Sequence, residues 1–233
     1  MIDRSLNYGR HHVRNFLIRS QPFQSVLDLG AGNGSDLLLA SEINPSACRI
    51  AIELYPPNIE RLQGLVSRVI PIDIEYERLP FGPGEIDVVI ANQVLEHTKE
   101  IFWIFHEVTR ILPVKGKFII GVPNLAALHN RLLLLTGHQP SPVKTASAHV
   151  RGFTKRDLMH FVDCCFPAGY RLAGFGGSNF YPFPAKIAKP LASLFPGMAW
   201  GIFLLLEKVR GYTDEFLRYP AVNQLETNFY LGN

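Results

Sequence analysis

Short apolar runs that alternate with helix-like segments are the feature that most limits the fold of this sequence. The runs occupy residues 25–30, 48–54, 67–74, 85–93 and 116–124. They lack a regular apolar–polar alternation, and continuous apolar runs are typical of strands covered on both faces. Strands that alternate with helices at this spacing predict βαβ units, and therefore an α/β fold in which a parallel sheet carries helices on both faces.

Helix signals lie between these runs. Pro56 and Pro57 suit the first turn of a helix, where proline's missing N–H leaves no hydrogen bond unmade. Residues 99–112 carry apolar side chains at helical spacing, namely Ile101, Ile104, Phe105, Val108, Ile111 and Leu112. The sequence therefore predicts helices that follow the second and fourth strands.

The pattern changes after residue 124. A helix-like piece and a loop rich in Pro, Ser and Thr fill residues 125–150, and a helix is expected next, with Thr154 as its N-cap and Asp157 three residues on. Two further strands are expected near 170–180 and 199–209, whereas residues 212–233 show no clear pattern. We expect one domain over 1–233, with an N-terminal helix at about 1–20 and an inserted cap at about 125–150.

The composition is that of a globular protein with no strong charge imbalance. Hydrophobic residues make up 47% of the 233 residues, and the net charge is +3, far from the concentrated positive field of a dedicated nucleic-acid binder. Three cysteines without C-x-x-C spacing argue against a disulfide scaffold or a zinc site, so no metal is expected. With no hydrophobic leader at the N-terminus, the prediction is a cytoplasmic protein.

An apolar stretch at 190–211 raises the question of a membrane segment. Pro196, Gly197 and Gly201 interrupt it, and the unbroken run from Trp200 to Leu206 is too short to cross a bilayer. A buried strand is the preferred interpretation, and contact with a membrane surface stays open.

The stretch SVLDLGAGNG at 25–34 places a carboxylate, Asp28, inside an apolar run and follows it with glycines at 30, 32 and 34. A parallel sheet binds ligands at the carboxyl ends of its strands. Glycines there let the backbone turn and approach a ligand closely, and the helix that starts near Ser35 offers free N–H groups to an anion. The stretch therefore predicts a ligand site.

Two more acids strengthen this prediction. Glu53 ends the second strand, where a carboxylate can accept hydrogen bonds from ribose hydroxyls, and Asp73 ends the third, where it can accept from an exocyclic amine. Singly, these acids have simpler explanations: Asp28 could cap a turn, Glu53 could be a solvated edge residue, and Asp73 could pair with Arg68. Their spacing at three successive strand ends favours one shared site.

The segments VLDLGAGNG, IAIEL, IPIDIE, IDVVIANQVLEH and GKFIIGVPN resemble the motif series of the class I S-adenosylmethionine-dependent methyltransferases, most closely the ubiquinone-biosynthesis-type and other small-molecule enzymes. The resemblance is strong over 26–124 and weaker beyond. It implies a doubly wound, Rossmann-like, seven-stranded and mostly parallel sheet, whose last strand, GIFLLLEKV, inserts antiparallel between its neighbours.

The resemblance also implies a role for each matching residue. Gly30, Ala31, Gly32 and Gly34 would hold the methionine part of S-adenosylmethionine, and Asp28 would face its amino group. Glu53 would bind the ribose, with Leu54 against the adenine, Asp73 at the adenine amine and Ile74 against its ring. Asn92 and Gln93 would border the transferred methyl. A dinucleotide dehydrogenase is the nearest competitor, but its G-x-G-x-x-G spacing is not the G-x-G-x-G found here.

Methyl transfer from a sulfonium mainly needs an aligned nucleophile, and a general base only where the acceptor must lose a proton. The stretch after Asn92 lacks the Pro-Pro-aromatic continuation of enzymes that methylate amide or nucleobase amines. An oxygen or carbon acceptor on a small molecule is therefore favoured, and no nucleic acid is expected as partner. His97 could be a base, or it could organise its loop together with Glu96.

The expected cap contains no acid from 125 to 151, and its basic side chains include Arg131, His138, Lys144, His149 and Arg151. Arg131, His149 and Arg151 are therefore candidates for binding an anionic or polar-headed acceptor, with a solvated loop as the simpler explanation. A lipid-like acceptor also stays open. The remaining alternative is a non-catalytic relative that serves as a partner or regulatory subunit.

Overall fold

The computed structural model describes residues 3–225 and contains a seven-stranded sheet in the order β3-β2-β1-β4-β5-β7-β6. Every neighbouring pair is parallel except those that β7 makes with β5 and β6, both antiparallel. The strands are β1 (Ser25–Leu29), β2 (Cys48–Ile52), β3 (Arg68–Ile70), β4 (Val88–Asn92), β5 (Lys117–Pro123), β6 (Tyr170–Ser178) and β7 (Gly201–Lys208). The predicted fold class is confirmed, including the antiparallel strand inserted between its neighbours.

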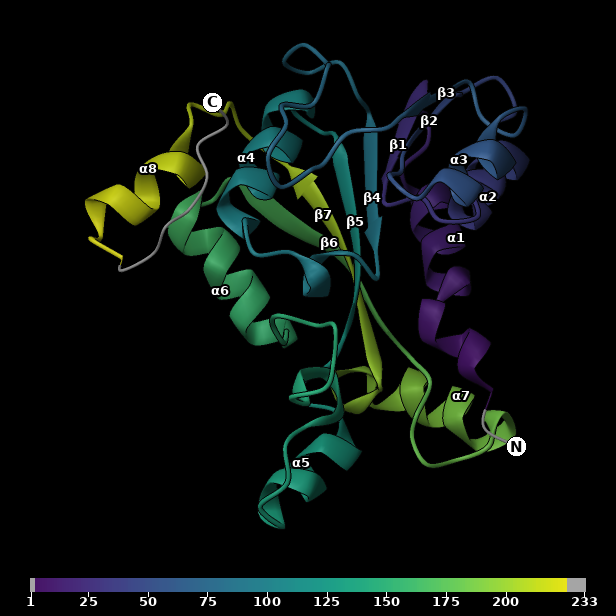
Figure 1. The fold of residues 1–233 in the computed structure, drawn as a ribbon, viewed down its shortest axis with the longest axis vertical. Helices are drawn as coiled ribbons and strands as arrows, with labels where there is room; N and C mark the ends of the chain where they lie inside the picture. Colours follow the sequence, from purple (N-terminus) through teal and green to yellow (C-terminus); the bar gives the residue numbers. More distant parts are fainter. Residues whose placement is uncertain (1–2, 226–233) are drawn as a thin grey trace.

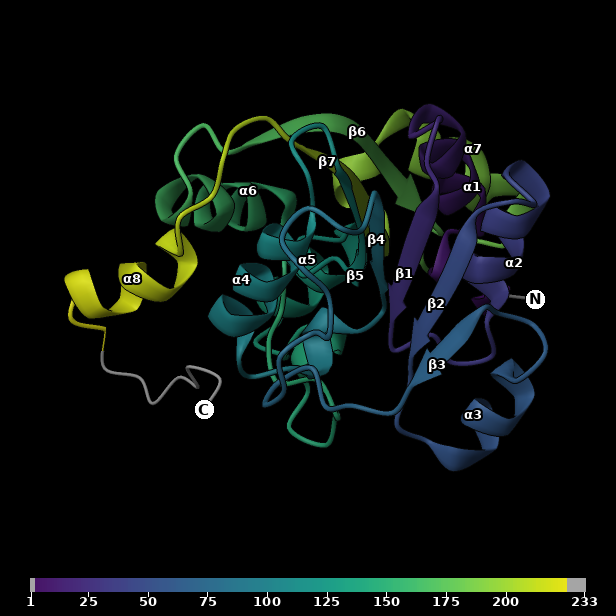
Figure 2. The ribbon, with the colours of Figure 1, turned by 90° about the horizontal axis from the view of Figure 1, so that it is seen from above.

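Helices cover both faces of the sheet (Figure 1, Figure 2). One face packs on α1 (Arg10–Arg19), α2 (Ser35–Ile43) and α3 (Pro56–Leu62), and the other on α4 (Ile101–Ile111), α6 (Lys155–Cys165) and α8 (Glu215–Val222). Side chains of β4 alternate between these two cores: Val88 and Ile90 face α1 and α2, whereas Val89 and Ala91 face α4. Because both directions are apolar, the strand reads as a continuous apolar run.

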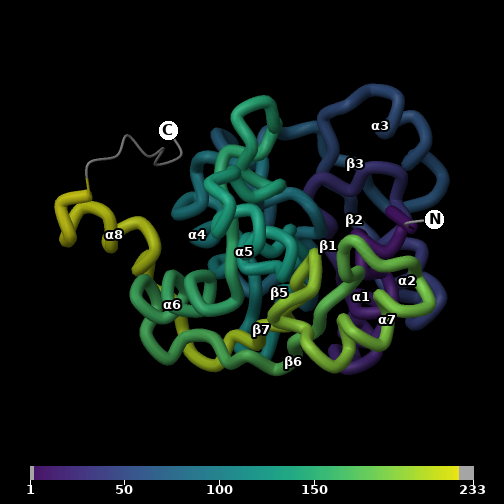
Figure 3. The backbone as a smooth tube through the Cα atoms, turned by 90° about the horizontal axis from the view of Figure 1, so that it is seen from below, coloured from purple at the N-terminus to yellow at the C-terminus, as the bar shows by residue number. Residues whose placement is uncertain are grey.

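The remaining elements lie around the C-terminal ends of the parallel strands. They are α5 (Leu128–Leu135), α7 (Ala185–Leu194) and the short 3₁₀ turns η1 (Arg4–Tyr8), η2 (Leu95–His97), η3 (Ser141–Val143) and η4 (Pro196–Met198). The tube in Figure 3, seen from below, shows α5 and α7 at this end of the molecule. A small apolar cluster that includes Phe180, Ala188 and Ala192 holds α7 in place.

Two helices lie where no helix was predicted. α7 carries Pro190 and α8 carries Pro220 inside the helix. Both segments are short, and a proline interrupts the helical pattern that would have identified them. Phe216 of α8 is fully buried against α4 and α6, so tertiary packing stabilises a helix that the local sequence indicates poorly.

Several local predictions are confirmed. Thr154 caps α6 by accepting a hydrogen bond from the Asp157 N–H, and Pro56 occupies the first turn of α3. Residues 201–206 of the apolar stretch are part of β7 and are buried in the sheet, and Trp200 directly precedes the strand. Among residues 3–225, no helix is both long and apolar enough to span a membrane.

Candidate cofactor and acceptor site

The glycine-rich loop begins directly where β1 ends. Gly30, Gly32 and Gly34 have φ of 62°, 55° and 77°, in the left-handed region that L-residues with a side chain seldom adopt. A Cβ atom on Gly30 would also lie 3.0 Å from Cγ2 of Val94, so the turn needs glycine for space as well as for conformation. The loop leads into α2, whose N-cap is Gly34.

A cavity of about 290 Å³ opens between this loop, η1, the start of α1 and the end of β4. Its lining consists mostly of polar groups and backbone: Tyr8, Arg10, Asp28, Gly30, Ala31, Gly32, Asn33, Ser35, Asp36 and Asn92. Five residues assigned to the cofactor from sequence therefore meet around one space, namely Asp28, Gly30, Ala31, Gly32 and Asn92.

Asp28 is the buried acid of β1 and points into this cavity. Its side chain is 3% exposed, and none of the residues 3–225 donates a hydrogen bond to its carboxyl group. Burial, together with the nearby carboxyls of Asp36 and Glu53, raises the pKa of Asp28 well above its ordinary value. A cation bound beside Asp28 would relieve this cost, so the site suits a ligand with a positive charge.

Asp36 and Asn92 bring three elements together at the cavity wall. The Asn92 side-chain amide donates to Asp36 Oδ2 at 2.8 Å and to the Tyr8 carbonyl at 3.0 Å. This joins the end of β4 to α2 and to η1. Asp36 Oδ1 and Asn92 Oδ1 are buried and lack a partner among the described residues, so two acceptors remain for ligand donors.

Glu53, at the end of β2, is buried, so the alternative that it is a solvated edge residue is excluded. It supports the glycine loop. Its Oε2 accepts a hydrogen bond from the Gly32 N–H at 2.7 Å, and its Oε1 accepts from the N–H groups of Leu54 and Tyr55 at 2.9 Å each. Asn58 adds a fourth donor at 3.3 Å. The carboxylate therefore positions the loop in addition to any role toward a ribose.

The other residues expected to contact the cofactor do not line this cavity. Leu54 is 53% exposed, and Gln93, like Leu54, is absent from the wall. The prediction that Asp73 ends a strand is wrong, because β3 stops at Ile70. Asp73 lies in the turn beyond, where its carboxylate accepts from the Glu75 N–H at 2.9 Å, and no ion pair joins it to Arg68 in the described chain. Ile74, next to it, packs on the core from a half-buried position.

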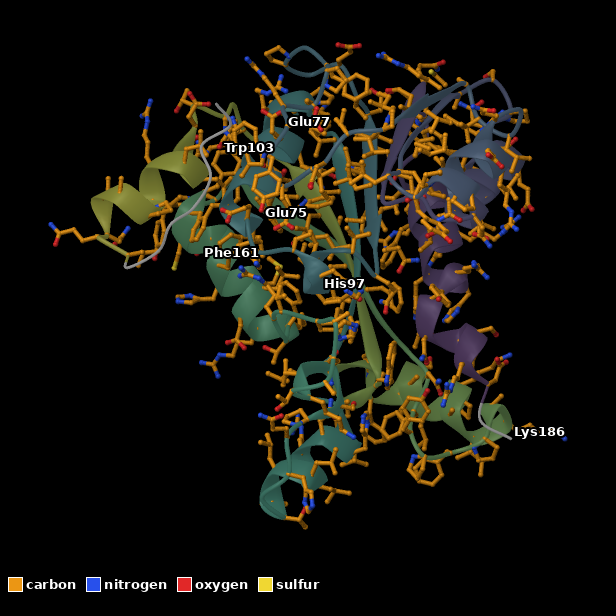
Figure 4. All side chains as sticks on the ribbon, viewed as in Figure 1. Glu75, Glu77, His97, Trp103, Phe161 and Lys186 are labelled. Atoms are coloured by element: carbon orange, nitrogen blue, oxygen red, sulfur yellow. The ribbon has the colours of Figure 1, made fainter. Side chains whose placement is uncertain are left out.

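His97 lies on η2, at the C-terminal ends of β4 and β5 (Figure 4). Its Nδ1 is 3.3 Å from the Ala148 carbonyl, and its ring meets that of His149 edge-on, with 4.7 Å between the ring centroids. Burial and the neighbouring His149 lower the pKa of His97. Beside them, burial raises the pKa of Glu96 to about 7. The structure therefore brings together His97, a candidate base, and His149, a candidate for binding the acceptor.

The two candidate arginines, Arg131 and Arg151, have different surroundings in the structure. Arg151 donates to the main-chain carbonyls of Thr98 and Lys99, so it ties the chain after the cap to the loop before α4. Arg131 lines a cavity of about 410 Å³ together with Lys155 and Arg156.

Tyr8, Arg10 and Asp36 line the first cavity and were not identified from the sequence as site residues. Asp36 was not identified because it is an acid in the first turn of a predicted helix, where acids are common. Arg10 and Tyr8 reach the cavity only because the N-terminal segment folds over β1 and β4. The apolar positions Val13 and Phe16 of α1 are buried against the sheet, and that pattern was the available signal.

The comparisons with known proteins agree with this geometry. Residues 27–120 match the family model described as "Methyltransferase domain". An arsenite methyltransferase of Halobacterium salinarum is 30% identical over 106 residues, 43% of this chain and 27% of its own. A malonyl-[acyl-carrier protein] O-methyltransferase of Legionella pneumophila is 28% identical over 94 residues, 39% of this chain and 33% of its own. The chain thus spans about a third or less of the curated relatives it matches.

Solved structures share the fold over a larger part of the chain. The plantazolicin methyltransferase BpumL in complex with SAH (S-adenosylhomocysteine) superposes with a TM-score of 0.60 at 17% identity, over 89% of this chain and 86% of its own. A chain from the complex of the Haloferax volcanii Trm112 methyltransferase activator with a methyltransferase gives 0.59 at 16% identity, over 88% and 92%. The chain therefore has the fold of these methyltransferases, and its residues 27–120 match a methyltransferase domain. No finding singles out the ubiquinone-type subgroup.

Proposed function

We propose that this chain, whose residues 27–120 match a methyltransferase domain, transfers the methyl group of S-adenosylmethionine to a small molecule, at oxygen or carbon. The observation that carries the proposal is the cavity at the ends of β1 and β4, where Asp28 and the glycine loop meet Asn92. These residues fit the cofactor's amino-acid end. Asp28 and Asp36 favour its ammonium group, and Arg10 in the same wall favours its carboxylate.

The adenosine half would extend toward Glu53 and the turn that holds Asp73. Glu53 would accept the ribose hydroxyls, exchanging the Gly32 N–H for a ligand donor, and Leu54 is exposed as a surface for the adenine. Asp73 and Ile74 would meet the adenine amine and ring after the turn has adjusted. Gln93, whose Nε2 is buried without a partner in the described residues, would lie with Asn92 near the methyl.

When bound, the cofactor supplies a methyl carbon on a sulfonium: a lone pair of the acceptor forms the new bond to that carbon, while the C–S bond breaks and its electron pair stays on the sulfur. The protein has to hold the acceptor in line, which can supply several kcal/mol of the barrier reduction (about 7–11 kcal/mol at best). A hydroxyl acceptor must also lose its proton, and His97, on η2 shortly after β4, would be the base that accepts it.

The acceptor is proposed to be anionic or polar-headed. Arg131, Lys155 and Arg156 line one cavity, and none of its other lining residues is acidic. An Arg131→Ala, Arg156→Ala double variant should raise KM for the acceptor and leave cofactor affinity unchanged, and equal losses in both would exclude the idea. Arg151 is a poorer test, because its removal also frees two main-chain carbonyls.

The cofactor is tested by thermal unfolding with S-adenosylmethionine, S-adenosylhomocysteine and NAD in parallel. A ligand at a hundred times its dissociation constant adds about 2.7 kcal/mol, which at about 2–4 °C per kcal/mol raises Tm by roughly 5–10 °C. The two sulfur ligands should give this shift and NAD none, and the Asp28→Asn variant should lose it. No shift with either sulfur ligand would exclude the proposal.

The alternative is a non-catalytic subunit that keeps the fold for a partner. A structural neighbour taken from a complex with a methyltransferase activator is the observation that favours it. Transfer of labelled methyl from S-adenosylmethionine to a panel of hydroxylated small molecules distinguishes the two. Turnover by the chain alone supports the enzyme, whereas cofactor binding without turnover until a partner is added supports the alternative.

A further inference from the structure

Glu96, His97 and His149 form a compact cluster at the sheet edge that also holds the cofactor cavity. One potential ligand atom from each residue can be chosen so that all lie within 4.8 Å of one another. Glu96 and His97 belong to η2, which begins three residues after Asn92, and His149 comes from the segment between α5 and α6. The Val150 N–H donates a main-chain hydrogen bond to the Glu96 carbonyl, at 2.8 Å, and holds the two segments together.

Both imidazoles are oriented by their Nδ1 atoms. Nδ1 of His97 lies 3.3 Å from the Ala148 carbonyl, and Nδ1 of His149 lies 2.9 Å from the Pro142 carbonyl. A carbonyl can only accept, so each Nδ1 carries a proton in these contacts, and in the neutral form of each ring Nε2 keeps a lone pair. A main-chain carbonyl behind one ring nitrogen is the usual arrangement around a histidine that binds a metal through the other.

The Glu96 side chain supplies the second, independent observation. It is 1% exposed, and its Oε2 is buried without a partner among the described residues. A buried carboxylate oxygen with nothing bound to it is costly. A cation between the three side chains would satisfy Glu96 and use both free lone pairs.

We propose that Glu96, His97 and His149 bind a divalent transition-metal ion of the zinc class. Two imidazole nitrogens and one carboxylate oxygen suit such an ion, whereas magnesium and calcium prefer oxygen ligands throughout. Three protein ligands leave at least one coordination position open. His97 is exposed, so this position is within reach of a small molecule. If the proposed methyl transfer to oxygen is correct, the acceptor hydroxyl binds there, and the metal promotes loss of its proton.

The test is titration of the chelator-treated 233-residue chain with zinc by isothermal calorimetry, with magnesium and calcium in parallel. We expect saturable binding of one zinc ion per cluster and no comparable binding of the other two. Glu96→Gln and His149→Ala should each weaken zinc binding by at least about 100-fold, beyond the loss typical of a residue that only orients a ligand. Glu96→Gln keeps the size of the side chain, and an unchanged Tm shift with S-adenosylhomocysteine shows that the variant is folded.

Cys164 and His160 supply the matched control, because the sulfur lies 3.5 Å from the ring in an exposed pair that could itself attract zinc. Cys164→Ser should leave the measured affinity unchanged. Zinc binding that is lost in Cys164→Ser but kept in Glu96→Gln would overturn the proposal, as would the absence of saturable binding in the wild type. Zinc and S-adenosylhomocysteine are titrated separately. Absence of zinc binding therefore overturns the metal site without affecting the cofactor site, and absence of S-adenosylhomocysteine binding overturns the cofactor site without affecting the metal site.

Discussion

Replacing Asp28 with asparagine should make the ligand-free protein more stable while removing its affinity for the cofactor. The Asp28 carboxyl is buried with no described donor and with two further carboxyls nearby. Leaving a buried polar group unsatisfied costs about 1–3 kcal/mol. An amide of the same shape carries no charge, so Asp28→Asn should remove the added cost of burying the ionised form, a gain of this order, or about 2–12 °C in Tm for a chain of this length.

The raised pKa of Asp28 also determines how the stability gain of Asp28→Asn changes with pH. Because the folded-state pKa of Asp28 is raised above the unfolded value, its contribution to stability is fully present below the unfolded pKa and is lost as pH rises through the folded pKa. The asparagine variant has no such loss. The stabilisation should therefore be largest at alkaline pH and should disappear in acid, where the wild-type carboxyl is protonated in both states.

The assay is thermal unfolding of wild type and variant across pH, without ligand and with S-adenosylhomocysteine. Asp87→Asn is the matched control, because Asp87 accepts from the N–H groups of Gln24 at 2.6 Å and Ser25 at 3.1 Å, and its replacement should lower Tm. An Asp28→Asn protein less stable than wild type at neutral pH, or a gain that does not change with pH, would refute the reasoning.

Three further outcomes follow from the same geometry. Glu53→Ala should lower the free energy of unfolding of the ligand-free protein by about 1–3 kcal/mol, measured by urea unfolding, because the Gly32 N–H and other donors lose their acceptor; unchanged stability would contradict it. Gly121→Ala would place a Cβ atom too close to Asn92 Oδ1. Calorimetry should therefore show weaker S-adenosylhomocysteine binding, and urea unfolding should show a free energy of unfolding lower by about 1–3 kcal/mol. Wild-type values in both measurements would refute this. Thr154→Ala should cost about 1 kcal/mol by loss of the α6 cap and leave cofactor affinity unchanged, whereas weaker binding would contradict it.

The parallel part of the fold could be predicted from sequence because its signals are local. Each strand of the sheet centre is an apolar run buried on both faces, as in β4, and the glycines at 30, 32 and 34 follow β1 directly. The strand after residue 67 was predicted too long, since Ile72 and Ile74 continue the apolar pattern beyond the hydrogen-bonded ladder. The helices with internal prolines were not predicted, because their local sequence has a low helix propensity. Burial of Phe216 and similar residues outweighs this low propensity in the folded chain.

The site was predictable only where it lies on consecutive motifs. Asp28 and the glycine loop are adjacent in the chain, so their pattern indicates a ligand by itself. Arg10 joins them through the packing of α1 on the sheet, and His149 joins His97 through main-chain contacts between distant segments. These contacts between residues distant in sequence depend on tertiary structure, and no local spacing in the sequence predicts them.

The most direct test of the account is isothermal calorimetry of S-adenosylhomocysteine with the wild-type chain and with Asp28→Asn. The account predicts one saturable site in the wild type and binding weakened by at least about tenfold in the variant, which corresponds to about 1.4 kcal/mol, although the variant is the more stable protein. Absence of binding in the wild type, or equal affinity in both, would contradict the claim that the cavity at the ends of β1 and β4 holds the cofactor.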